Sequence, residues 1–263
     1  MLPDFATHVH TVLDRPALLV IDMQRGFLAE DGEYARMGRR ICGGLGVIPV
    51  ILRLLNEFRN RGLPRYFTAF RYQPDGSDYP GRLPGILPKA YEGRNNPIFT
   101  PSSPATAMVP ELSPREGEVV VYKDRYSGFF GTDLGERLER AGVRTLVTTG
   151  ILSHVCVSAT AVDAFSRGFS VVLVRDATAG TDPILHEAAL RNLADTVGVV
   201  WDHDKVLQSL GPGDGKQGGP AGHPSNPVGG PGGVQVEAPP PGNTGREALG
   251  NSLSGTSSSR TRR

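Results

Sequence analysis

Cysteine and long hydrophobic runs are both scarce in this sequence of 263 residues. It has two cysteines, too few for a disulfide framework and in keeping with a reducing compartment. No apolar run approaches the ~20 residues that a membrane-spanning helix needs. The first 16 residues contain Asp4, His8, His10 and Asp14 and lack the apolar segment of a secretory signal. We therefore expect a soluble, cytoplasmic protein.

A charge excess of one sign is also missing. Lys and Arg number 28 against 27 Asp and Glu, which gives no electrostatic footprint for nucleic acid or an anionic membrane. The six histidines are isolated in sequence, which argues against a metal site. The glycine cluster Gly43-Gly-Leu-Gly46 lacks the strand–turn–helix context of a phosphate-binding loop. We predict a small-molecule ligand, with no metal, cofactor, nucleic-acid or membrane partner.

Glycine and proline are plentiful, but their excess is local. Residues 211–263 hold 14 of the 34 glycines and 8 of the 22 prolines, and no aromatic residue. A segment of this composition cannot bury enough apolar surface to fold. We therefore predict one domain over residues 1–210, long enough for a full core. A disordered tail, 211–263, would follow it, either as an inert extension or as a linker or partner-binding segment.

Short apolar runs alternate with helical patterns along residues 1–210. Such runs are typical of strands buried on both faces, and apolar spacings of three and four predict helices. The alternation implies right-handed crossovers and a single-domain, doubly wound, three-layer α/β fold with a mostly parallel six-stranded sheet. The expected strands are 17–21, 66–70, 119–122, 145–149, 169–174 and 197–201, and the expected helices are 47–58, 134–141, 155–167, 183–195 and a terminal turn at 205–210. Residues 72–117, with nine prolines, are expected to form a lid or binding loop.

Three reactive side chains follow three of these strands. Asp22 follows the first strand, Lys123 follows the third, and Cys156 comes after the fourth at the predicted start of a helix. Ligands of doubly wound sheets bind at the carboxyl ends of the strands, so we expect all three groups on one rim. The helix dipole and Lys123 should favour a thiolate at Cys156. Each residue also has a plain structural interpretation: a turn-capping Asp, a solvated Lys and a small buried Cys.

Two other residues are weaker candidates for this chemistry. Cys42, in Ile41-Cys-Gly-Gly44, has no acid or base beside it, and we interpret it as structural. His154 lies two residues before Cys156, so the two side chains should point to different faces of a helix or turn. His154 should therefore not take the thiol proton, and we interpret it as a pocket-lining or capping group.

Three segments together resemble the isochorismatase-like cysteine hydrolases. They are Leu18-Leu-Val-Ile-Asp-Met-Gln24, Lys123-Asp-Arg-Tyr-Ser-Gly-Phe-Phe-Gly-Thr-Asp-Leu134 and Thr149-Gly-Ile-Leu-Ser-His-Val-Cys-Val157. The resemblance covers roughly residues 15–205 and implies a catalytic triad of Asp22, Lys123 and Cys156. It also implies a cis peptide between Ile151 and Leu152. An oxyanion hole would be formed by the backbone N–H groups of Leu152 and Cys156.

The resemblance also narrows the reaction. Metal-binding nicotinamidases of the family carry an Asp-x-His pair and further histidines after the second strand, where this chain has Arg71-Tyr-Gln-Pro-Asp-Gly-Ser-Asp78. The isochorismate-cleaving members lack the nucleophilic cysteine. What remains is hydrolysis of a C–N bond in a small carboxamide, ureido or carbamoyl compound through a thioester, by a protein that forms a homo-oligomer. Residues expected to bind the substrate are Phe27, Tyr91, Tyr126, Phe129 and His154.

Two other functions remain open on the same observations. A non-catalytic module with this fold would keep the rim to bind a small molecule or a protein. A flavodoxin-like nucleotide binder would fit the alternation of strands and helices but would lack a phosphate loop. Hydrolysis of a small amide that is lost in a Cys156→Ala variant would separate the hydrolase from both.

Overall fold

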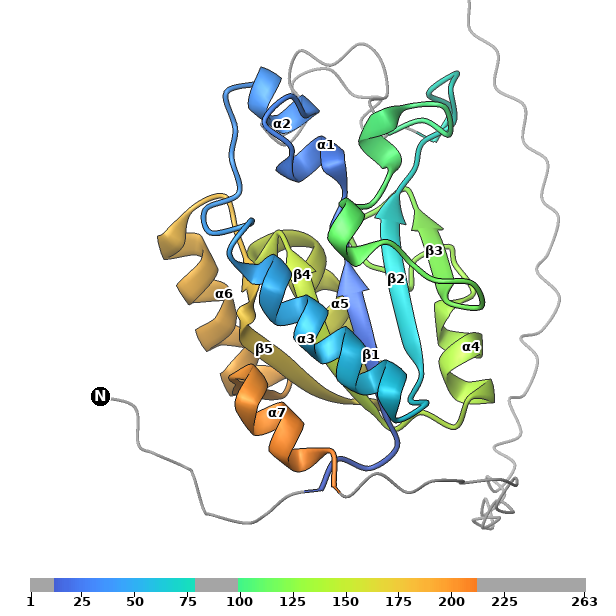
Figure 1. Ribbon diagram of the computed structural model, residues 1–263, viewed down its shortest axis with the longest axis vertical. Helices are drawn as coiled ribbons and strands as arrows, with labels where there is room; N and C mark the ends of the chain where they lie inside the picture. The colour runs from blue at the N-terminus through green and yellow to red at the C-terminus, as the bar shows by residue number, and fades with distance from the viewer. Residues whose placement is uncertain (1–11, 79–98, 212–263) are drawn as a thin grey trace, which may run out of the picture. The chain divides into compact units, whose positions relative to one another are not determined.

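The short apolar runs that were predicted to be strands form the sheet. In the computed structural model, which describes residues 12–78 and 99–211, six parallel strands lie in the order β3-β2-β1-β4-β5-β6. The doubly wound α/β fold is confirmed, with the strand order reversing beside β1 (Figure 1). The strands are β1 (Pro16–Ile21), β2 (Arg65–Phe70), β3 (Val119–Lys123), β4 (Thr145–Ile151), β5 (Ser170–Ala179) and β6 (Val199–Trp201).

Helices cover both faces of this sheet. On one face, α3 (Val47–Asn60) packs against β1, β5 and α7 (His203–Ser209). On the other face, α5 (Ser158–Ser166) and α6 (Pro183–Thr196) pack against each other and against β5 (Figure 1). The helix α4 (Leu134–Arg140) makes the crossover from β3 to β4. The result is the three-layer arrangement that the alternating pattern predicted.

Shorter turns lie beyond the carboxyl ends of the strands (Figure 1). Two are the single-turn helices α1 (Arg25–Leu28) and α2 (Glu33–Arg36), which follow β1. Two more are 3₁₀ turns, Pro104–Thr106 and Pro110–Leu112, within the region expected to be a loop. The last is a π-helical turn, Ser153–Val157, between β4 and α5. The two single-turn helices and the π turn contribute residues to the wall of the site described below.

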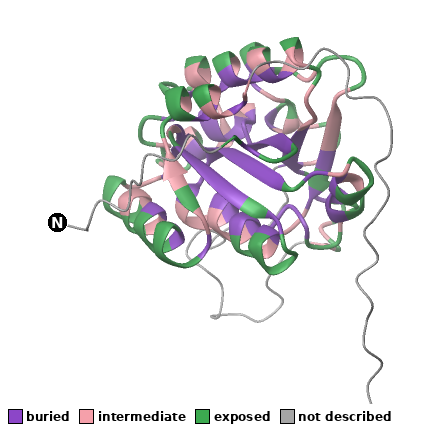
Figure 2. Ribbon diagram, turned by 90° about the horizontal axis from the view of Figure 1, so that it is seen from below, coloured by how far each residue is buried: buried purple, intermediate pink, exposed green. Residues whose placement is uncertain are grey.

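The apolar pattern accounts for the layers. All six residues of β1 are buried, as expected for a strand covered on both faces. On α3, the residues spaced three and four apart are the buried ones: Val47, Ile51, Leu54, Leu55 and Phe58. Figure 2 shows the buried strands in the middle and the helices with exposed outer faces.

Two elements differ from the expectation at the carboxyl end of the sheet. β5 continues past residue 174 to Ala179, and its pairing with β4 shifts register between Thr148 and Gly150. The predicted helix 155–167 is divided into the π turn and α5. Local sequence patterns carry no signal for either irregularity, because both depend on how β4 meets its neighbours.

Gly150 shows how closely β4 approaches β1. Its φ is 120°, a backbone conformation that residues with a side chain rarely adopt, and a Cβ there would lie 2.1 Å from the carbonyl oxygen of Ile21. Only glycine fits this position. The close approach brings the chain that leaves β4 next to the chain that leaves β1, and so brings the segment of Cys156 toward Asp22.

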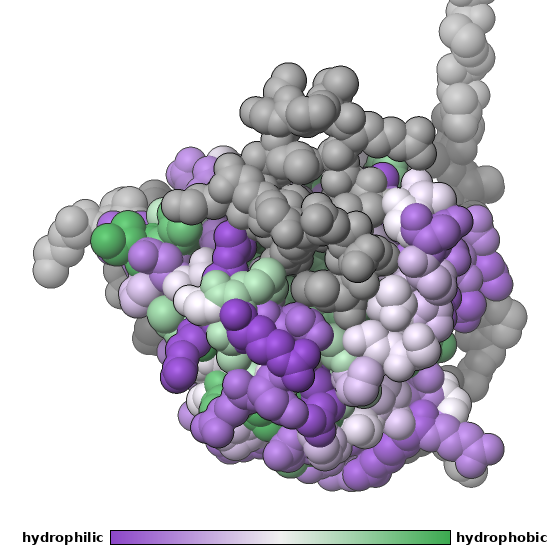
Figure 3. All heavy atoms as spheres, turned by 90° about the horizontal axis from the view of Figure 1, so that it is seen from above, coloured by the Kyte–Doolittle hydropathy of each residue, from purple (hydrophilic) through white to green (hydrophobic). Residues whose placement is uncertain are grey.

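Some predicted features lie outside the described residues. They are the tail, 211–263, apart from Gly211, and residues 79–98 of the proline-rich loop, which include Tyr91. No helix in the described part of the chain is long and apolar enough to cross a membrane. Seen from above the carboxyl ends of the strands, the described surface is mostly hydrophilic, with small scattered hydrophobic patches (Figure 3).

Candidate active site

Asp22, the residue directly after β1, has an unusual backbone conformation. Its φ is 56°, one of three positive values among the described non-glycine residues, and such a conformation is costly for an L-residue. The surrounding chain holds it there: its N–H donates to the Thr68 carbonyl at 3.0 Å, and its carbonyl accepts from the N–H of Gln24 at 2.7 Å. This sharp turn directs the carboxylate across the end of β2.

Two donors hold the carboxylate of Asp22, which is completely buried. The hydroxyl of Thr68, on β2, donates to Oδ1 at 2.8 Å, and the ammonium of Lys123, at the end of β3, donates to Oδ2 at 2.8 Å. Both side chains of the ion pair are 0% exposed. A buried charge is tolerated only when it is paired and hydrogen-bonded, and here each carboxylate oxygen has its own donor.

Lys123 has further partners that keep its charge in this buried position. Its Nζ donates to the carbonyl of Arg125 at 3.1 Å and lies 3.6 Å from the centre of the Phe70 ring. An ammonium over an aromatic face is attracted to the ring electrons. The lysine is therefore fixed, not solvated, and the solvated interpretation of Lys123 is wrong.

Gln24 joins the ends of two strands and was not singled out from the sequence as a site residue. Its amide exchanges hydrogen bonds with the backbone of Phe70: Nε2 donates to the carbonyl at 2.9 Å, and Oε1 accepts from the N–H at 2.8 Å. Nε2 also donates to the carbonyl of Thr106 at 3.0 Å. Gln24 lies in the quoted segment that ends Asp-Met-Gln, so the family motif was the available signal.

The turn after β4 begins at Leu152, whose backbone is left-handed with φ 61° and ψ 53°. The expected cis peptide between Ile151 and Leu152 is wrong, because the described residues contain no cis bond. A non-proline cis bond costs about 3–4 kcal/mol, and here the left-handed residue reverses the chain. The Leu152 carbonyl then accepts from the N–H groups of Val155 and Val157 at 2.8 and 3.3 Å, which closes the π turn.

Cys156 lies in this π turn and is fully buried. Its carbonyl accepts from the hydroxyl of Thr160 at 2.7 Å, and the same hydroxyl accepts from the N–H of Gly128 at 3.0 Å. Thr160 thereby ties the cysteine segment to the loop that follows Lys123. The thiol lies within hydrogen-bonding reach of Asp22 and Lys123. The structure thus brings the three predicted residues together at one point of the rim.

The electrostatics of the thiol differ from the expectation. Burial raises the pKa of Cys156 well above its usual value, Lys123 acts to lower it, and the Asp22 carboxylate raises it further. Lys123 therefore favours the thiolate, as expected, but burial, the largest effect, and the Asp22 carboxylate act in the opposite direction. The resting group is a neutral thiol beside a carboxylate that can accept its proton.

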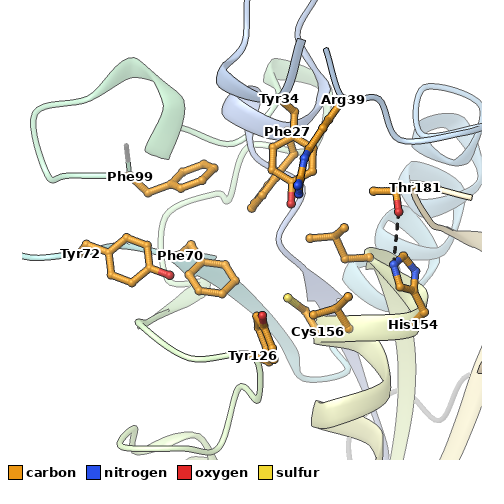
Figure 4. A pocket seen from close by; sticks show the side chains of 12 residues that line it. Phe27, Tyr34, Arg39, Phe70, Tyr72, Phe99, Tyr126, His154, Cys156 and Thr181 are labelled. Carbon is orange, nitrogen blue, oxygen red and sulfur yellow. Dashed lines mark hydrogen bonds between the residues drawn. The ribbon is translucent and has the colours of Figure 1, made fainter. Parts of the chain in front are cut away.

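A pocket opens in front of the Cys156 sulfur (Figure 4). One side of it consists mainly of aromatic rings, and the other side carries polar groups. Among the residues expected to bind substrate, Phe27, Tyr126 and His154 line it. Leu152, expected to donate to the oxyanion, also lines it, as do Tyr72 and Phe99 of the expected binding loop. The lining residues that were not singled out from the sequence are Tyr34, Arg39, Phe70, Val155 and Thr181.

Phe129 does not line this pocket. It is buried, its ring stacks on Phe169 with centroids 6.1 Å apart, and the guanidinium of Arg167 lies 5.1 Å from its centroid. The expectation that Phe129 binds substrate is therefore not supported, because its position after Lys123 directs it into the core. Aromatic residues in a loop motif are frequently packing residues. Tyr91 lies outside the described residues.

His154 faces the polar side of the pocket. Its Nε2 lies 3.3 Å from the hydroxyl of Thr181 (Figure 4). Burial lowers the pKa of His154, so the ring is neutral at neutral pH. Its contact with Thr181 agrees with the prediction that it lines the pocket. Within the described residues, no group of three His, Cys, Asp or Glu side chains could hold a metal ion.

Cys42 is held in place by hydrogen bonds to the segment after β5. It is exposed, its N–H donates to the carbonyl of Gly180 at 2.7 Å, and its Sγ donates to the carbonyl of Thr181 at 3.3 Å. Its backbone pairs with Gly180 as an isolated antiparallel bridge. These bonds attach the segment before α3 to the end of β5, which agrees with a structural role for Cys42.

Comparison with known proteins places this geometry in a family. A family model for the Isochorismatase domain matches residues 16–205. The ureidoacrylate amidohydrolase RutB of Methylobacterium radiotolerans is 34% identical over 206 residues, covering 74% of this chain and 79% of the relative. A cysteine hydrolase from Pseudomonas syringae pv. phaseolicola matches with a TM-score of 0.65 at 25% identity, covering 74% of this chain and 92% of that chain.

An N-carbamoylsarcosine amidase from Thermoplasma acidophilum is a further structural match. Its TM-score is 0.59 at 25% identity, over 73% of this chain and 98% of that chain. The family model spans all six strands and the segments of Asp22, Lys123 and Cys156. The resemblance found in the sequence motifs is therefore confirmed, and this chain belongs to the isochorismatase family.

Proposed function

We propose that this protein hydrolyses a C–N bond of a small ureido or carbamoyl compound through a thioester on Cys156. The observation that carries the proposal is the buried carboxylate of Asp22. One of its oxygens is bound by Lys123, and the thiol of Cys156 lies within reach. This arrangement supplies a nucleophile, a base and a counter-charge that are buried at the end of a pocket. Such a site serves covalent acyl transfer.

The first half-reaction starts from the neutral thiol. Asp22 takes the thiol proton as the sulfur attacks the carbonyl carbon, so a C–S bond forms and the carbonyl oxygen becomes an oxyanion. We assign the N–H groups of Leu152 and Cys156, both on the pocket wall, as donors to this oxyanion. One such donor contributes about 3–4 kcal/mol to the transition state. Asp22 then returns the proton to the amine as the C–N bond breaks.

The second half-reaction releases the acyl group. Asp22 takes a proton from water, the resulting hydroxide attacks the thioester carbon, and the C–S bond breaks as the sulfur recovers a proton. Lys123 keeps its bond to Asp22 Oδ2 through both steps. Its charge stabilises the carboxylate whenever the proton is absent. A ureido substrate would yield an amine and carbamic acid, which decomposes to ammonia and carbon dioxide.

The class of the reaction is that of the relatives, which are hydrolases of non-peptide C–N bonds. A ureidoacrylate amidohydrolase and an N-carbamoylsarcosine amidase both act on a carbamoyl group attached to nitrogen. These names favour ureido and carbamoyl compounds over simple carboxamides for this chain. The small, ring-lined pocket suits a small molecule. The prediction of a homo-oligomer stays a prediction, which light scattering of the purified protein checks.

Ammonia release from ureidoacrylate, N-carbamoylsarcosine and nicotinamide tests the proposal. We expect turnover of at least one of the first two compounds. In Cys156→Ala, kcat should fall by about 10⁴-fold or more because no thioester can form. Cys42→Ala is the matched control and should retain wild-type kcat, since Cys42 lies on the surface. Turnover by Cys156→Ala equal to that of the wild type would refute the thioester.

A non-catalytic binding module is favoured by one observation, the complete burial of Cys156. A buried neutral thiol is also what a structural cysteine would be. The two functions separate in a mass-spectrometric experiment on protein quenched with acid during turnover. A hydrolase would show a fraction of the chain carrying the acyl mass on Cys156. A binding module would show the unmodified mass and no ammonia.

A further inference from the structure

The pocket carries an uneven distribution of charge that the proposed reaction does not use. Among its described lining residues, Arg39 is the one with a permanent formal charge, and none of them is an Asp or a Glu. His154, on the same side, is kept neutral because burial lowers its pKa. The Asp22–Lys123 pair behind the thiol has no net charge. Arg39 thus brings a formal positive charge to the described wall of the pocket.

The backbone fixes the position of Arg39. Gly38 turns the chain with φ 66°, and the N–H of Arg39 then donates to the carbonyl of Tyr34 at 2.8 Å. Three residues later, Cys42 is bonded to Gly180 and to Thr181. The segment is thus anchored at one end to α2 and at the other to the end of β5. Arg39 belongs to the framework of the pocket.

The direction of the side chain completes the observation. In Figure 4, Arg39 comes down from the opposite side of the pocket to Cys156, with the aromatic rings on one flank and His154 and Thr181 on the other. A substrate whose carbonyl carbon is at the sulfur would therefore extend toward the guanidinium. A guanidinium binds a carboxylate through two parallel hydrogen bonds, and rings around it exclude the water that would weaken them.

We propose that Arg39 is a specificity-determining residue that binds a carboxylate on the leaving amine of the substrate. The inference rests on the proposed function and narrows it: the substrate is a carbamoylated amino acid, an anion, in place of a neutral urea or amide. The contact holds the far end of the substrate, so it orients the carbamoyl carbon toward the Cys156 sulfur. The carboxylate keeps its charge through the reaction, and the bond acts on substrate binding.

The experiment compares acids with uncharged analogues of matched length. The pairs are ureidoacetate with 2-hydroxyethylurea, 3-ureidopropionate with 3-hydroxypropylurea, and N-carbamoylsarcosine with 1-(2-hydroxyethyl)-1-methylurea. Wild-type protein should prefer the acid of at least one pair. In Arg39→Gln, the ratio of kcat/KM for that acid to kcat/KM for its alcohol should fall about 10- to 100-fold, mainly through KM of the acid.

Two further variants test the charge. Arg39→Lys keeps the cation without the two-pronged geometry and should retain part of the preference. Arg40→Gln removes the charge of the next residue, which is exposed and is not among the residues lining the pocket, and should leave the ratio at its wild-type value. An equal loss for acid and alcohol in Arg39→Gln, or a wild-type enzyme indifferent to the carboxylate, would overturn the inference and leave the proposed function standing.

Calorimetry on Cys156→Ala separates the inference from the hydrolase proposal. This variant should bind the preferred acid more tightly than its alcohol, and adding Arg39→Gln should abolish the difference. Binding that follows this pattern without any turnover by the wild type would refute the hydrolase and support the anion site. Equal affinity for acid and alcohol in Cys156→Ala would refute the anion site.

Discussion

The hydroxyl of Thr68 provides a test of the role of Asp22 that leaves the nucleophile intact. Its Oγ1 donates to Asp22 Oδ1 at 2.8 Å, and Thr68 is fully buried in β2. Valine has nearly the same shape, so Thr68→Val removes this hydrogen bond while the strand keeps its packing. A hydrogen bond to a charged group contributes about 1.5–3 kcal/mol. We expect the free energy of unfolding, measured by urea denaturation at neutral pH, to fall by that amount.

In the proposed mechanism, the same bond also fixes the carboxylate for proton transfer. If its loss is expressed in the transition state, kcat/KM should fall about 10- to 100-fold, since each tenfold corresponds to about 1.4 kcal/mol. Ammonia release at neutral pH, measured over a range of substrate concentrations, gives this change in kcat/KM.

A matched control separates catalysis from stability. Thr149 is also buried, and its Oγ1 donates to the neutral carbonyl of Leu19 at 3.0 Å. Thr149→Val should lower the free energy of unfolding by about 0.5–1.5 kcal/mol and leave kcat/KM at its wild-type value. A kcat/KM that stays at its wild-type value in Thr68→Val would refute Asp22 as the base.

Two predictions concern residues away from the reacting groups. Burial acts to raise the pKa of Glu118, but the hydrogen bonds from Arg59 and the charges of Arg59 and Arg65 bring it from 4.5 to about 2. The stabilisation from ionised Glu118 is therefore complete above about pH 4.5 and is lost as the pH falls toward 2. Glu118→Gln should lower the free energy of unfolding by about 3 kcal/mol at neutral pH and by less than half of that near pH 3. A loss of stability that does not depend on pH in urea denaturation would contradict this. Phe129→Leu should lower the free energy of unfolding by about 1 kcal/mol and leave KM unchanged, whereas a raised KM would return Phe129 to the substrate pocket.

The sequence allowed the fold and the meeting of three residues to be predicted because both follow from short-range patterns. A run such as Ala17–Ile21 reports a strand buried on both faces, and the alternation of strands with helices fixes a parallel sheet. In such a sheet, the residues that follow the strands share one edge. Asp22, Lys123 and Cys156 could therefore be assigned to one place without knowing any distance.

What the sequence did not reveal depends on contacts between distant segments. Arg39 reaches the pocket because Gly38 turns the chain and Cys42 pairs with Gly180, and no periodicity encodes that pairing. The protonation of Cys156 depends on complete burial, which a position at the start of a helix does not indicate. Phe129 could not be distinguished from a pocket residue because its neighbour Tyr126 in the same motif is one.

The side-chain amide of Gln24 has a mechanical consequence. It donates to the Phe70 carbonyl at the end of β2 and to the carbonyl of Thr106. The hydroxyl of Thr106 donates in turn to the carbonyl of Thr100, the residue after Phe99. Gln24 is also two positions from Asp22 and bonded to its carbonyl. A substrate large enough to displace the Phe99 ring would therefore disturb the turn that carries the Asp22 carboxylate. We expect relatives that differ in the size of their substrates to differ first on the opposite wall of the pocket.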